Sequence, residues 1–490
     1  MKRRIFSKMF LSVLLVCTLF TTVACSNSDE YITKGTNLNQ EDLNSSDRVT
    51  IYTYVDPDNK DLHYDQDTKF YYPLLDMVHM YNNYCSLNKM GEYSVKVVSF
   101  SSRDRMIQQM STEIMAGGGP DIIILDNELP VSKLINQGAF ADMNILLKND
   151  KSERKINLDD YDNTLMDTGV FKGKRYMMPM LIEPDIYISN SALFKDYDLA
   201  TNTRLTYSNI NNKLKKFANN SNNLSLTDSY SSSKEIILHY INDNINKEDY
   251  TTDFETKKFK STIESLKKLV KKSIADTKTT KDLSKSECLL SKGTTDKETG
   301  IYTPYNFSLT HMSGYSSTQT TFTGGITEKE NQSRATISCG FMINNNSNKK
   351  EKAFEFIKYS LGERMQRFIT FDSTYGDTYN ITVNKDALNN SLSSFAYGDI
   401  YNITVNKDAL NNSLSSFSYG GADFDEIKEQ DSFMDKYASY INSINTYEIR
   451  DGYYNDKVIG SLVDDYLQDK ISIDNFIANL NSKTKIYLYE

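Results

Sequence analysis

Residues 110–126, with the sequence MSTEIMAGGGPDIIILD, limit the possible folds more than any other segment of this chain. Apolar residues recur at helical spacing as far as Met115. Three consecutive glycines, residues 117–119, then end the predicted helix, because glycine adopts a left-handed backbone without strain. Pro120 prevents the helix from restarting. Residues 122–125 form the short apolar run of a parallel strand covered on both faces, so the segment predicts part of an α/β sheet.

The residues before this segment predict the same kind of sheet. Residues 49–55 and 93–100 are rich in β-branched and aromatic side chains, as strands are, and residues 74–84 have helical periodicity. This alternation of strand and helix is typical of parallel α/β sheets. Ligands of such sheets bind beyond the carboxyl ends of the strands, where Asp126 is expected. A helix cap or a solvated loop residue is the alternative role for this carboxylate.

Several motifs resemble those of the extracellular solute-binding proteins of ABC importers, in particular the carbohydrate-binding branch that includes maltose-binding protein. The motifs are GGGPDIIILD followed by LINQGAFADMN, then FKGKRYMMP with YISNSALF, then the strand and helix of residues 335–365, and finally residues 471–490. Residues 200–335 match weakly. The resemblance implies an α/β fold of two lobes, with a hinge and a ligand cleft between the lobes.

The resemblance also implies domain boundaries. Residues 48–168 and 320–372 would form lobe 1, and residues 169–319 and 373–490 would form lobe 2. Residues 375–396 recur almost unchanged as residues 397–418, which indicates a tandem duplication. Two copies are too few for a solenoid. One copy would replace the single family segment and the other would be an insertion, and the sequence does not decide which is which.

The family pattern gives six candidate ligand-binding residues. Carboxylates would accept hydrogen bonds from solute hydroxyl groups and aromatic rings would stack on the solute. The candidates are Tyr54, Asp56, Asp126, Glu183, Tyr315 and Phe322. Core packing is the alternative for Tyr54, and a surface turn is the alternative for Glu183. A calcium loop that begins at Asp56 is disfavoured, because Asp61 stands where such a loop needs glycine.

The first 24 residues predict a secretory signal, with a basic start, a short apolar core and small residues before Cys25. The sequence VAC resembles a lipoprotein cleavage site, so lipid attachment at Cys25 is expected, followed by a flexible tether to residue 47. A plain signal peptidase cut or an uncleaved anchor are the alternatives. The lipid would place the protein on the outer face of the cytoplasmic membrane of a bacterium, of Gram-positive type.

Composition narrows the class of ligand and partner. The net charge of −9 becomes −13 once the four basic residues of the signal are removed, which argues against nucleic acid as a partner. Three scattered cysteines remain besides Cys17 and Cys25, so neither a disulfide framework nor a zinc site is indicated, and we expect buried thiols. Tryptophan is absent, so tyrosine and phenylalanine must supply any ring stacking.

These observations predict a lipid-anchored monomer that captures a mono- or oligosaccharide and delivers it to the transmembrane subunits of an ABC permease. No catalytic motif, cofactor fingerprint or metal-ligand spacing is found in the sequence. A sugar sensor or adhesion lipoprotein without a permease is the main alternative. An anchored glycoside hydrolase is the less favoured one, and it would need two carboxylates across a cleft.

Overall fold

The computed structural model describes most of the chain between residues 47 and 489. The described residues are 47–54, 71–126, 128–152, 154–200, 203–219, 224–227, 229–246, 249–274, 288–290, 293–295, 302–304, 320–367, 381–382, 440 and 442–489. The signal, Cys25, the tether and almost all of the duplicated segment lie outside these ranges. So does most of residues 433–444, whose apolar pattern predicts a helix.

The first half of the chain forms the predicted parallel α/β unit. Its elements are β1 (Val49–Thr53), α4 (Tyr71–Leu87), β2 (Val95–Ser99), α5 (Arg103–Met115) and β3 (Ile122–Ile124). Strand β1 pairs in parallel with both β2 and β3. The short 3-10 helix η3 (Gly91–Tyr93) joins α4 to β2.

The glycine turn after α5 has the predicted left-handed backbone at two of its three residues. The φ angles are +83° at Gly117 and +95° at Gly119. A Cβ atom on Gly119 would lie 3.2 Å from Cγ1 of Ile114, so the turn is also too close to the helix for a larger residue. Met115 ends the apolar series of this helix, but unlike Met106, Ile107, Met110 and Ile114 it is not buried, with 63% of its surface exposed.

Two strands from later in the sequence, β6 (Met178–Pro184) and β15 (Arg334–Ile343), join the sheet of this α/β unit and extend it beyond the unit. Strand β15 is antiparallel to both β3 and β6. The strand order is β16-β6-β15-β3-β1-β2, where β16 is Ile381–Thr382. Strand β17 (Thr446–Ile449), which we did not predict, pairs in parallel with the first residues of β15.

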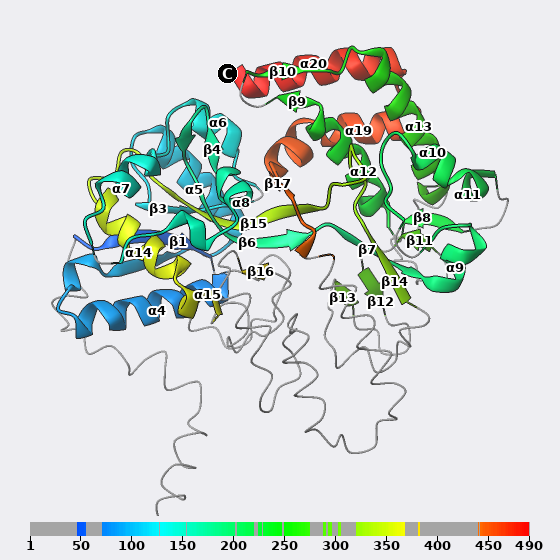
Figure 1. Cartoon of the computed structure of the whole chain (residues 1–490). Coiled ribbons are helices and arrows are strands. Elements are labelled where there is room, and N and C mark those ends of the chain that lie inside the picture. Colours follow the sequence, from blue (N-terminus) through cyan, green and yellow to red (C-terminus); the bar gives the residue numbers. More distant parts are fainter. Residues whose placement is uncertain are drawn as a thin grey trace, which may run out of the picture.

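Short helices and one long helix cover the faces of this sheet (Figure 1). They are α6 (Val131–Asn136), α7 (Met143–Asn149), η4 (Leu158–Asp160), α8 (Asn163–Asp167), α14 (Lys350–Leu361) and α15 (Glu363–Arg367). A small hairpin of β4 (Val170–Phe171) and β5 (Lys174–Arg175) precedes β6.

The second unit is also α/β, with short strands and longer helices. Its strands are β7 (Ile186–Asn190), β8 (Ser225–Thr227), β9 (Ile245–Asn246), β10 (Thr251–Thr252), β11 (Cys288–Leu290), β12 (Gly293–Thr295), β13 (Tyr302–Pro304) and β14 (Thr320–Gly324). Its helices are α9 (Ser191–Asp196), α10 (Ile210–Lys213), α11 (Lys215–Asn219), α12 (Tyr230–Asp243), α13 (Lys257–Ile274), the π-helix η7 (Tyr453–Val458), α19 (Gly460–Leu467) and α20 (Ile473–Tyr489).

The two units have separate hydrophobic cores, which define lobe 1 and lobe 2. Within the described residues, the chain changes core between Ile186 and Tyr187, between Ile326 and Ala335, and between Ile449 and Tyr453. These changes fall later than the predicted boundaries at residues 169, 320 and 373. The first shift arises because β6 pairs with β15 and so remains in the sheet of lobe 1.

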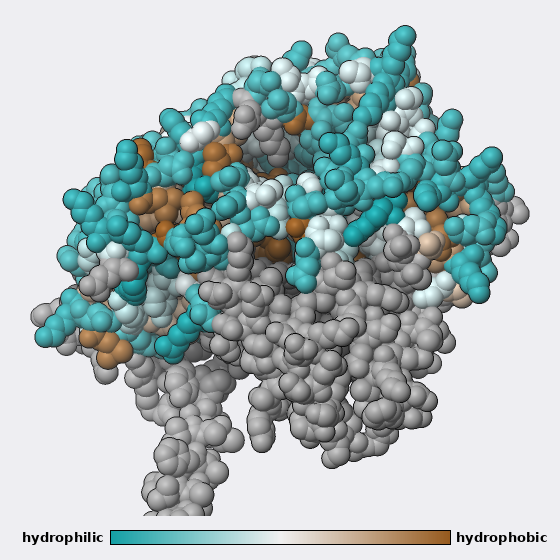
Figure 2. All heavy atoms as spheres, in the orientation of Figure 1, coloured by the Kyte–Doolittle hydropathy of each residue, from teal (hydrophilic) through white to brown (hydrophobic). Residues whose placement is uncertain are grey.

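Two properties match the composition of the sequence: the polarity of the surface and the burial of the cysteines. The face shown in Figure 2 is mostly hydrophilic, and its hydrophobic residues form small separate groups. Cys85, Cys288 and Cys339 are buried, as predicted, and these three residues form no disulfide bond. Within the described residues, no helix is both long and apolar enough to span a membrane.

Candidate functional site

Strands β6, β15 and β17 connect the two lobes and bring one row of side chains together. Glu183 of β6 pairs with Thr336 of β15, and Thr336 pairs with Glu448 of β17. Residues paired across neighbouring strands point to the same face of a sheet. Glu183 and Glu448 therefore share one face at the junction of the lobes, and Glu183 lies within strand β6 and not in a surface turn.

The alternating residues of β17 contact different lobes. The hydroxyl of Tyr447 donates a hydrogen bond of 3.0 Å to Asp162, and Ile449 packs against the core of lobe 1. On the other face, Glu448 lies 2.9 Å from Nδ1 of His239 on α12 of lobe 2. Arg450, which follows the strand, lies 3.2 Å from Glu235 on the same helix. Strand β17 is therefore placed between the lobes and bonded to both.

A cluster of paired charges surrounds His239. The side chain of Arg334 is 3% exposed, and its guanidinium forms an ion pair with Asp243 and lies 3.5 Å from Glu448. Asp243 also accepts a hydrogen bond of 2.9 Å from the hydroxyl of Tyr207. Burial raises the pKa of Asp243 although the charge of Arg334 opposes this effect. In this cluster the carboxylates of Asp243, Glu448 and Glu235 pair with two guanidiniums and one imidazole. The charge of a fourth carboxylate, on Asp185, also acts on Arg334 and His239.

Burial alone would lower the pKa of His239. The charge of Glu448 and hydrogen bonds with Glu235 and Glu448 outweigh burial and raise the pKa from 6.5 to about 9. The imidazole is therefore protonated at neutral pH, so both ring nitrogens are donors. Nδ1 is also 2.7 Å from Nη1 of Arg334. We assign the hydrogen bond of Nδ1 to Glu448, because an imidazolium cannot accept one.

This shift predicts a pH-dependent contribution of His239 to folding stability. Because the pKa is higher in the folded protein than the unfolded value of 6.5, protonation stabilises the fold fully below pH 6.5, and this stabilisation is lost as the pH rises through about 9. The difference between the folded and unfolded pKa values corresponds to about 3 kcal/mol of folding stability. Denaturant unfolding of the native protein and of His239→Gln at pH 6 and pH 10 measures this contribution. We expect the advantage of the native protein to shrink at pH 10, and an advantage that is equal at both pH values would contradict the assignment.

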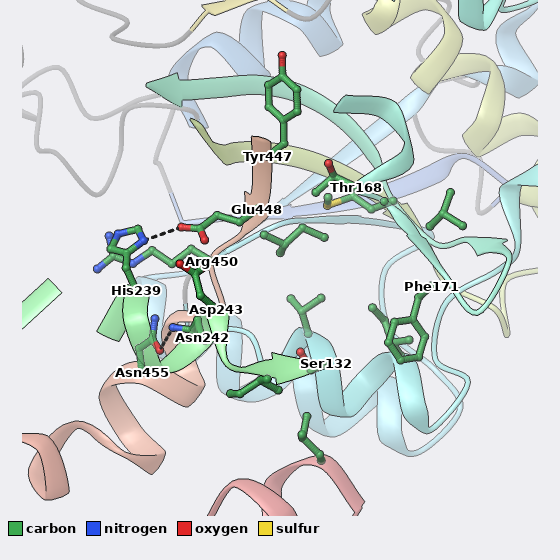
Figure 3. A pocket seen from close by; sticks show the side chains of 18 of the residues that line it. Ser132, Thr168, Phe171, His239, Asn242, Asp243, Tyr447, Glu448, Arg450 and Asn455 are labelled. Atoms are coloured by element: carbon green, nitrogen blue, oxygen red, sulfur yellow. Dashed lines mark hydrogen bonds and ion pairs between the residues drawn. The ribbon is translucent and has the colours of Figure 1, made fainter. Parts of the chain in front are cut away.

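A cavity of about 430 Å³ lies between the lobes, beside β17 and α12 (Figure 3). Lobe 1 contributes residues of α6, such as Ser132, and of the β4–β5 hairpin, such as Phe171. Lobe 2 contributes α12, Tyr250 and Leu488. In Figure 3, Glu448 and His239 point toward one another at one side of the cavity, and Phe171 and Ser132 lie across it.

Tyr54, Asp126 and Glu183, the predicted ligand-binding residues whose side chains the structure describes, do not line this cavity. Asp126 follows β3 as expected, but its carboxylate accepts hydrogen bonds of 3.1 and 2.9 Å from Arg103 and one of 2.8 Å from the amide of Glu128. Tyr54 follows β1 and packs against the core of lobe 1. Phe322 lies in β14 opposite Ile188, but its side chain is outside the described part.

Two predicted residues, Asp56 and Tyr315, fall outside the described residues, as does the calcium loop that we disfavoured. Among the residues that the structure does describe, acidic, histidine and cysteine side chains do not gather in a group that could bind a metal ion.

Sequence reasoning missed His239, Arg334 and Arg450. They come from three elements that are far apart in the chain, and each lies in a segment whose pattern indicates only a helix, a strand or a turn. The ion pair of Arg334 could have been suspected only from a charge at the start of an otherwise apolar strand.

The fold and the junction define a two-lobed binding protein whose lobes are joined by a strand hinge. The family described as bacterial extracellular solute-binding protein matches residues 84–393. This protein belongs to that family. No curated protein sequence matches the chain.

Solved structures with the same fold have low sequence identity. An ABC substrate-binding protein of Listeria monocytogenes in complex with cycloalternan has 14% identity and a TM-score of 0.53. A cyclic α-maltosyl-1,6-maltose binding protein of Arthrobacter globiformis has 12% identity and a TM-score of 0.55. UgpB of Mycobacterium tuberculosis, in complex with glycerophosphocholine, has 11% identity and a TM-score of 0.53. Each comparison covers 90% of this chain and 98% of the other.

Proposed function

We propose that this protein captures a carbohydrate between its two lobes and delivers it to an ABC permease, and that it acts by binding alone. The observation that carries the proposal is the strand hinge. Within the described residues, the chain passes between the two separate cores at the connections that flank β6, β15 and β17, so the lobes can change their separation while each core stays folded. A solute that contacts both lobes stabilises the closed arrangement, because only in that arrangement does it touch both lobes at once.

The chemistry of Glu183 and Arg450 supports a hydroxylated solute. Burial lowers the pKa of Arg450, but the charges of Glu235 and Glu183 outweigh burial and raise it, so these groups are close neighbours. The side chain of Arg450 is 37% exposed, and Glu183 is half-buried. A carboxylate beside a guanidinium offers an acceptor and several donors to a sugar hydroxyl. Of the three solved structures named above, one is in complex with cycloalternan and another is a cyclic α-maltosyl-1,6-maltose binding protein.

The other sequence-predicted ligand residues remain part of the proposal. Asp56, Tyr315 and Phe322 would extend the site from Glu183, and Tyr54 follows β1 at the same end of the sheet. Asp126 would act indirectly, since its carboxylate already binds Arg103.

Lipid attachment at Cys25 would keep a monomer at the outer face of the cytoplasmic membrane, near its permease. Such attachment needs two or more acyl chains for firm membrane binding. Mass spectrometry of the N-terminal peptide from membranes tests this proposal, since a lipidated Cys25 adds the mass of the acyl groups.

A ligand screen on the protein without residues 1–24 tests solute capture. Maltodextrins, cyclic glucans and glycerophosphocholine are added in a thermal-shift assay, in which a solute at 100 times its Kd stabilises the fold by about 2.7 kcal/mol. We expect at least one carbohydrate to raise the Tm and to change the small-angle scattering profile. Stabilisation by glycerophosphocholine alone, or by none of the compounds, would contradict the carbohydrate assignment.

Two matched variants test the site. Glu183→Gln should raise the Kd for the bound carbohydrate about tenfold or more, because a hydrogen bond to a charged acceptor contributes about 1.5–3 kcal/mol. Glu92→Gln removes an equal charge from an exposed residue of η3 and should leave the Kd unchanged. Equal Kd values for the two variants would exclude Glu183 from the site.

A further inference from the structure

The two lobes touch one another directly at the end of the interlobe cavity that lies away from the strand hinge. Figure 1 shows the C-terminal end of α20 in lobe 2 beside α6 in lobe 1. Phe171 of lobe 1 lines this end of the cavity together with Tyr250 and Leu488 of lobe 2. In Figure 3, Phe171 lies across the cavity from Glu448 of β17. These contacts between the lobes therefore cover the cavity at the end opposite the hinge.

Asn136, the last residue of α6, is bonded to lobe 2 through both polar atoms of its side chain. Nδ2 donates a hydrogen bond of 2.7 Å to the carbonyl of Leu488. Oδ1 accepts a hydrogen bond from the hydroxyl of Tyr250. The amide thus places its donor on an acceptor and its acceptor on a donor, which fixes its orientation. Both hydrogen bonds exist only while α6 of lobe 1 lies beside α20 of lobe 2.

The ring of Tyr250 lies between side chains of both lobes. Its centroid is 6.0 Å from that of Phe171 in lobe 1 and 5.3 Å from that of Tyr489 in its own lobe. Nζ of Lys172, in the turn of the β4–β5 hairpin, lies 4.2 Å from the centroid of the Tyr250 ring. Tilted and edge-on ring pairs and a cation beside a ring are favourable contacts. Tyr489 therefore supports the ring at the place where Phe171 and Lys172 meet it.

The backbone of Tyr250 indicates that this side chain is needed between the lobes. Its φ angle is +62°, in the left-handed region, where a bulky residue is strained and glycine is not. Strain of this kind persists only where surrounding contacts hold the residue in place, and it is concentrated at functional sites. Asn136, Phe171 and Lys172 supply such contacts, and all three belong to lobe 1.

A further contact between the lobes is weaker. Nζ of Lys457 in η7 lies 3.6 Å from Glu128 of lobe 1, and the two side chains are 54% and 34% exposed. Water screens an ion pair with this exposure, so it contributes little to holding the lobes together. The ring contacts and hydrogen bonds of Tyr250 and Asn136 are therefore the stronger link between α20 and lobe 1.

We propose that Tyr250 and Asn136 form a clasp that holds the two lobes closed over the cavity and slows the release of a captured solute. The clasp consists of protein side chains alone, so it favours the closed arrangement before any solute contacts are added. Its effect on release rests on the proposed function, because Arg450, which is proposed above to contact the solute, also lines this cavity. A solute beneath the clasp leaves faster when the lobes open more often.

The distance between the lobes tests the clasp without any solute. Ile145→Cys on α7 and Lys268→Cys on α13 place one nitroxide label at an exposed position of each lobe, in protein without residues 1–24 and with Cys25→Ser. The other three native cysteines are buried. Pulsed electron paramagnetic resonance then measures the distribution of label distances.

In Tyr250→Gly we expect molecules with a longer label distance at the expense of the native distance. The ratio of open to closed molecules should rise about tenfold, because an aromatic pair and a hydrogen bond between the lobes are lost together. The distribution of distances in the native protein is the reference. An identical distribution in Tyr250→Gly would overturn the clasp.

Matched variants separate loss of the clasp from a change in the backbone. Lys89→Gly relieves a left-handed residue with φ of +57° at an exposed position after α4, and it should leave the label distances unchanged. If Tyr250→Gly does not fold, as judged by circular dichroism, Asn136→Ala should lengthen the label distance instead. Its control is Asn479→Ala, because the side-chain hydrogen bond of Asn479 stays within α20. Equal distances in Asn136→Ala and Asn479→Ala would then overturn the clasp.

The rate of solute release separates the clasp from solute capture. For a carbohydrate that binds, Tyr250→Gly should raise the dissociation rate about tenfold in stopped-flow measurements, for the same loss of contacts, and Lys89→Gly should not change it. An unchanged dissociation rate in Tyr250→Gly would overturn the role in release and leave solute capture intact. If no carbohydrate binds, solute capture fails, and the label distances still decide whether the clasp holds the lobes closed.

Discussion

Replacing Arg334 by leucine will lower the free energy of unfolding by about 3–5 kcal/mol. The guanidinium lies between Asp243 and Glu448 with a side chain that is only 3% exposed. Leucine removes the positive charge and leaves two carboxylates close together in a poorly hydrated place, where one must take up a proton or the junction must open. Urea unfolding at pH 7, followed by circular dichroism, measures the loss.

A surface ion pair provides the matched control. Nζ of Lys258 lies 2.5 Å from Glu328, but the two side chains are 68% and 42% exposed. Lys258→Leu should therefore change stability by no more than about 0.5 kcal/mol. If Arg334→Leu and Lys258→Leu lowered the free energy of unfolding by similar amounts, the cluster around Arg334 would not be the buried network described above.

Truncating one aromatic ring in each core should destabilise the corresponding lobe by about 3–5 kcal/mol. Phe356 of α14 is fully buried in lobe 1 beside Tyr81 and Phe341, with ring centroids 5.2 and 5.6 Å away. Phe259 of α13 is fully buried in lobe 2 and stacks on Tyr240 at 5.2 Å. Phe356→Ala and Phe259→Ala therefore weaken different cores.

Hydrogen exchange read by mass spectrometry distinguishes the two effects. With Phe356→Ala we expect faster exchange in β1, β2 and α4, and with Phe259→Ala in α12 and α19. Faster exchange in both lobes for either variant would show that the two cores unfold as one cooperative unit, contrary to their separation in the structure.

The sequence predicts most elements of lobe 1 because their signals are local. The glycine turn, the apolar run of β3 and the face of α14 each depend on residues close together in the chain, and the structure has all three. The periodicity of residues 236–245 and 259–274 also predicts two helices, and the structure has both, although α12 begins six residues earlier, at Tyr230. The family resemblance and the two-lobed fold are confirmed by the family match and by the solved structures.

The lobe boundaries and the junction could not be predicted in the same way. The change of core after β6 depends on its pairing with β15, about 150 residues away in sequence, and periodicity carries no information on such pairing. Strand β17 is only four residues long and mixes Tyr447, Glu448 and Ile449, because its two faces contact different lobes. The charges of His239 and Arg334 acquire their partners only through this arrangement.

The placement of α20 in the same core as β7 has a consequence for biosynthesis. Tyr187 and Leu488 are separated by some 300 residues, yet both belong to the core of lobe 2. A chain made from its N-terminus therefore cannot finish this lobe until residues 473–489 have left the ribosome. Until then the core of lobe 2 lacks its final covering, and exposed apolar surface of this kind favours aggregation in a growing chain.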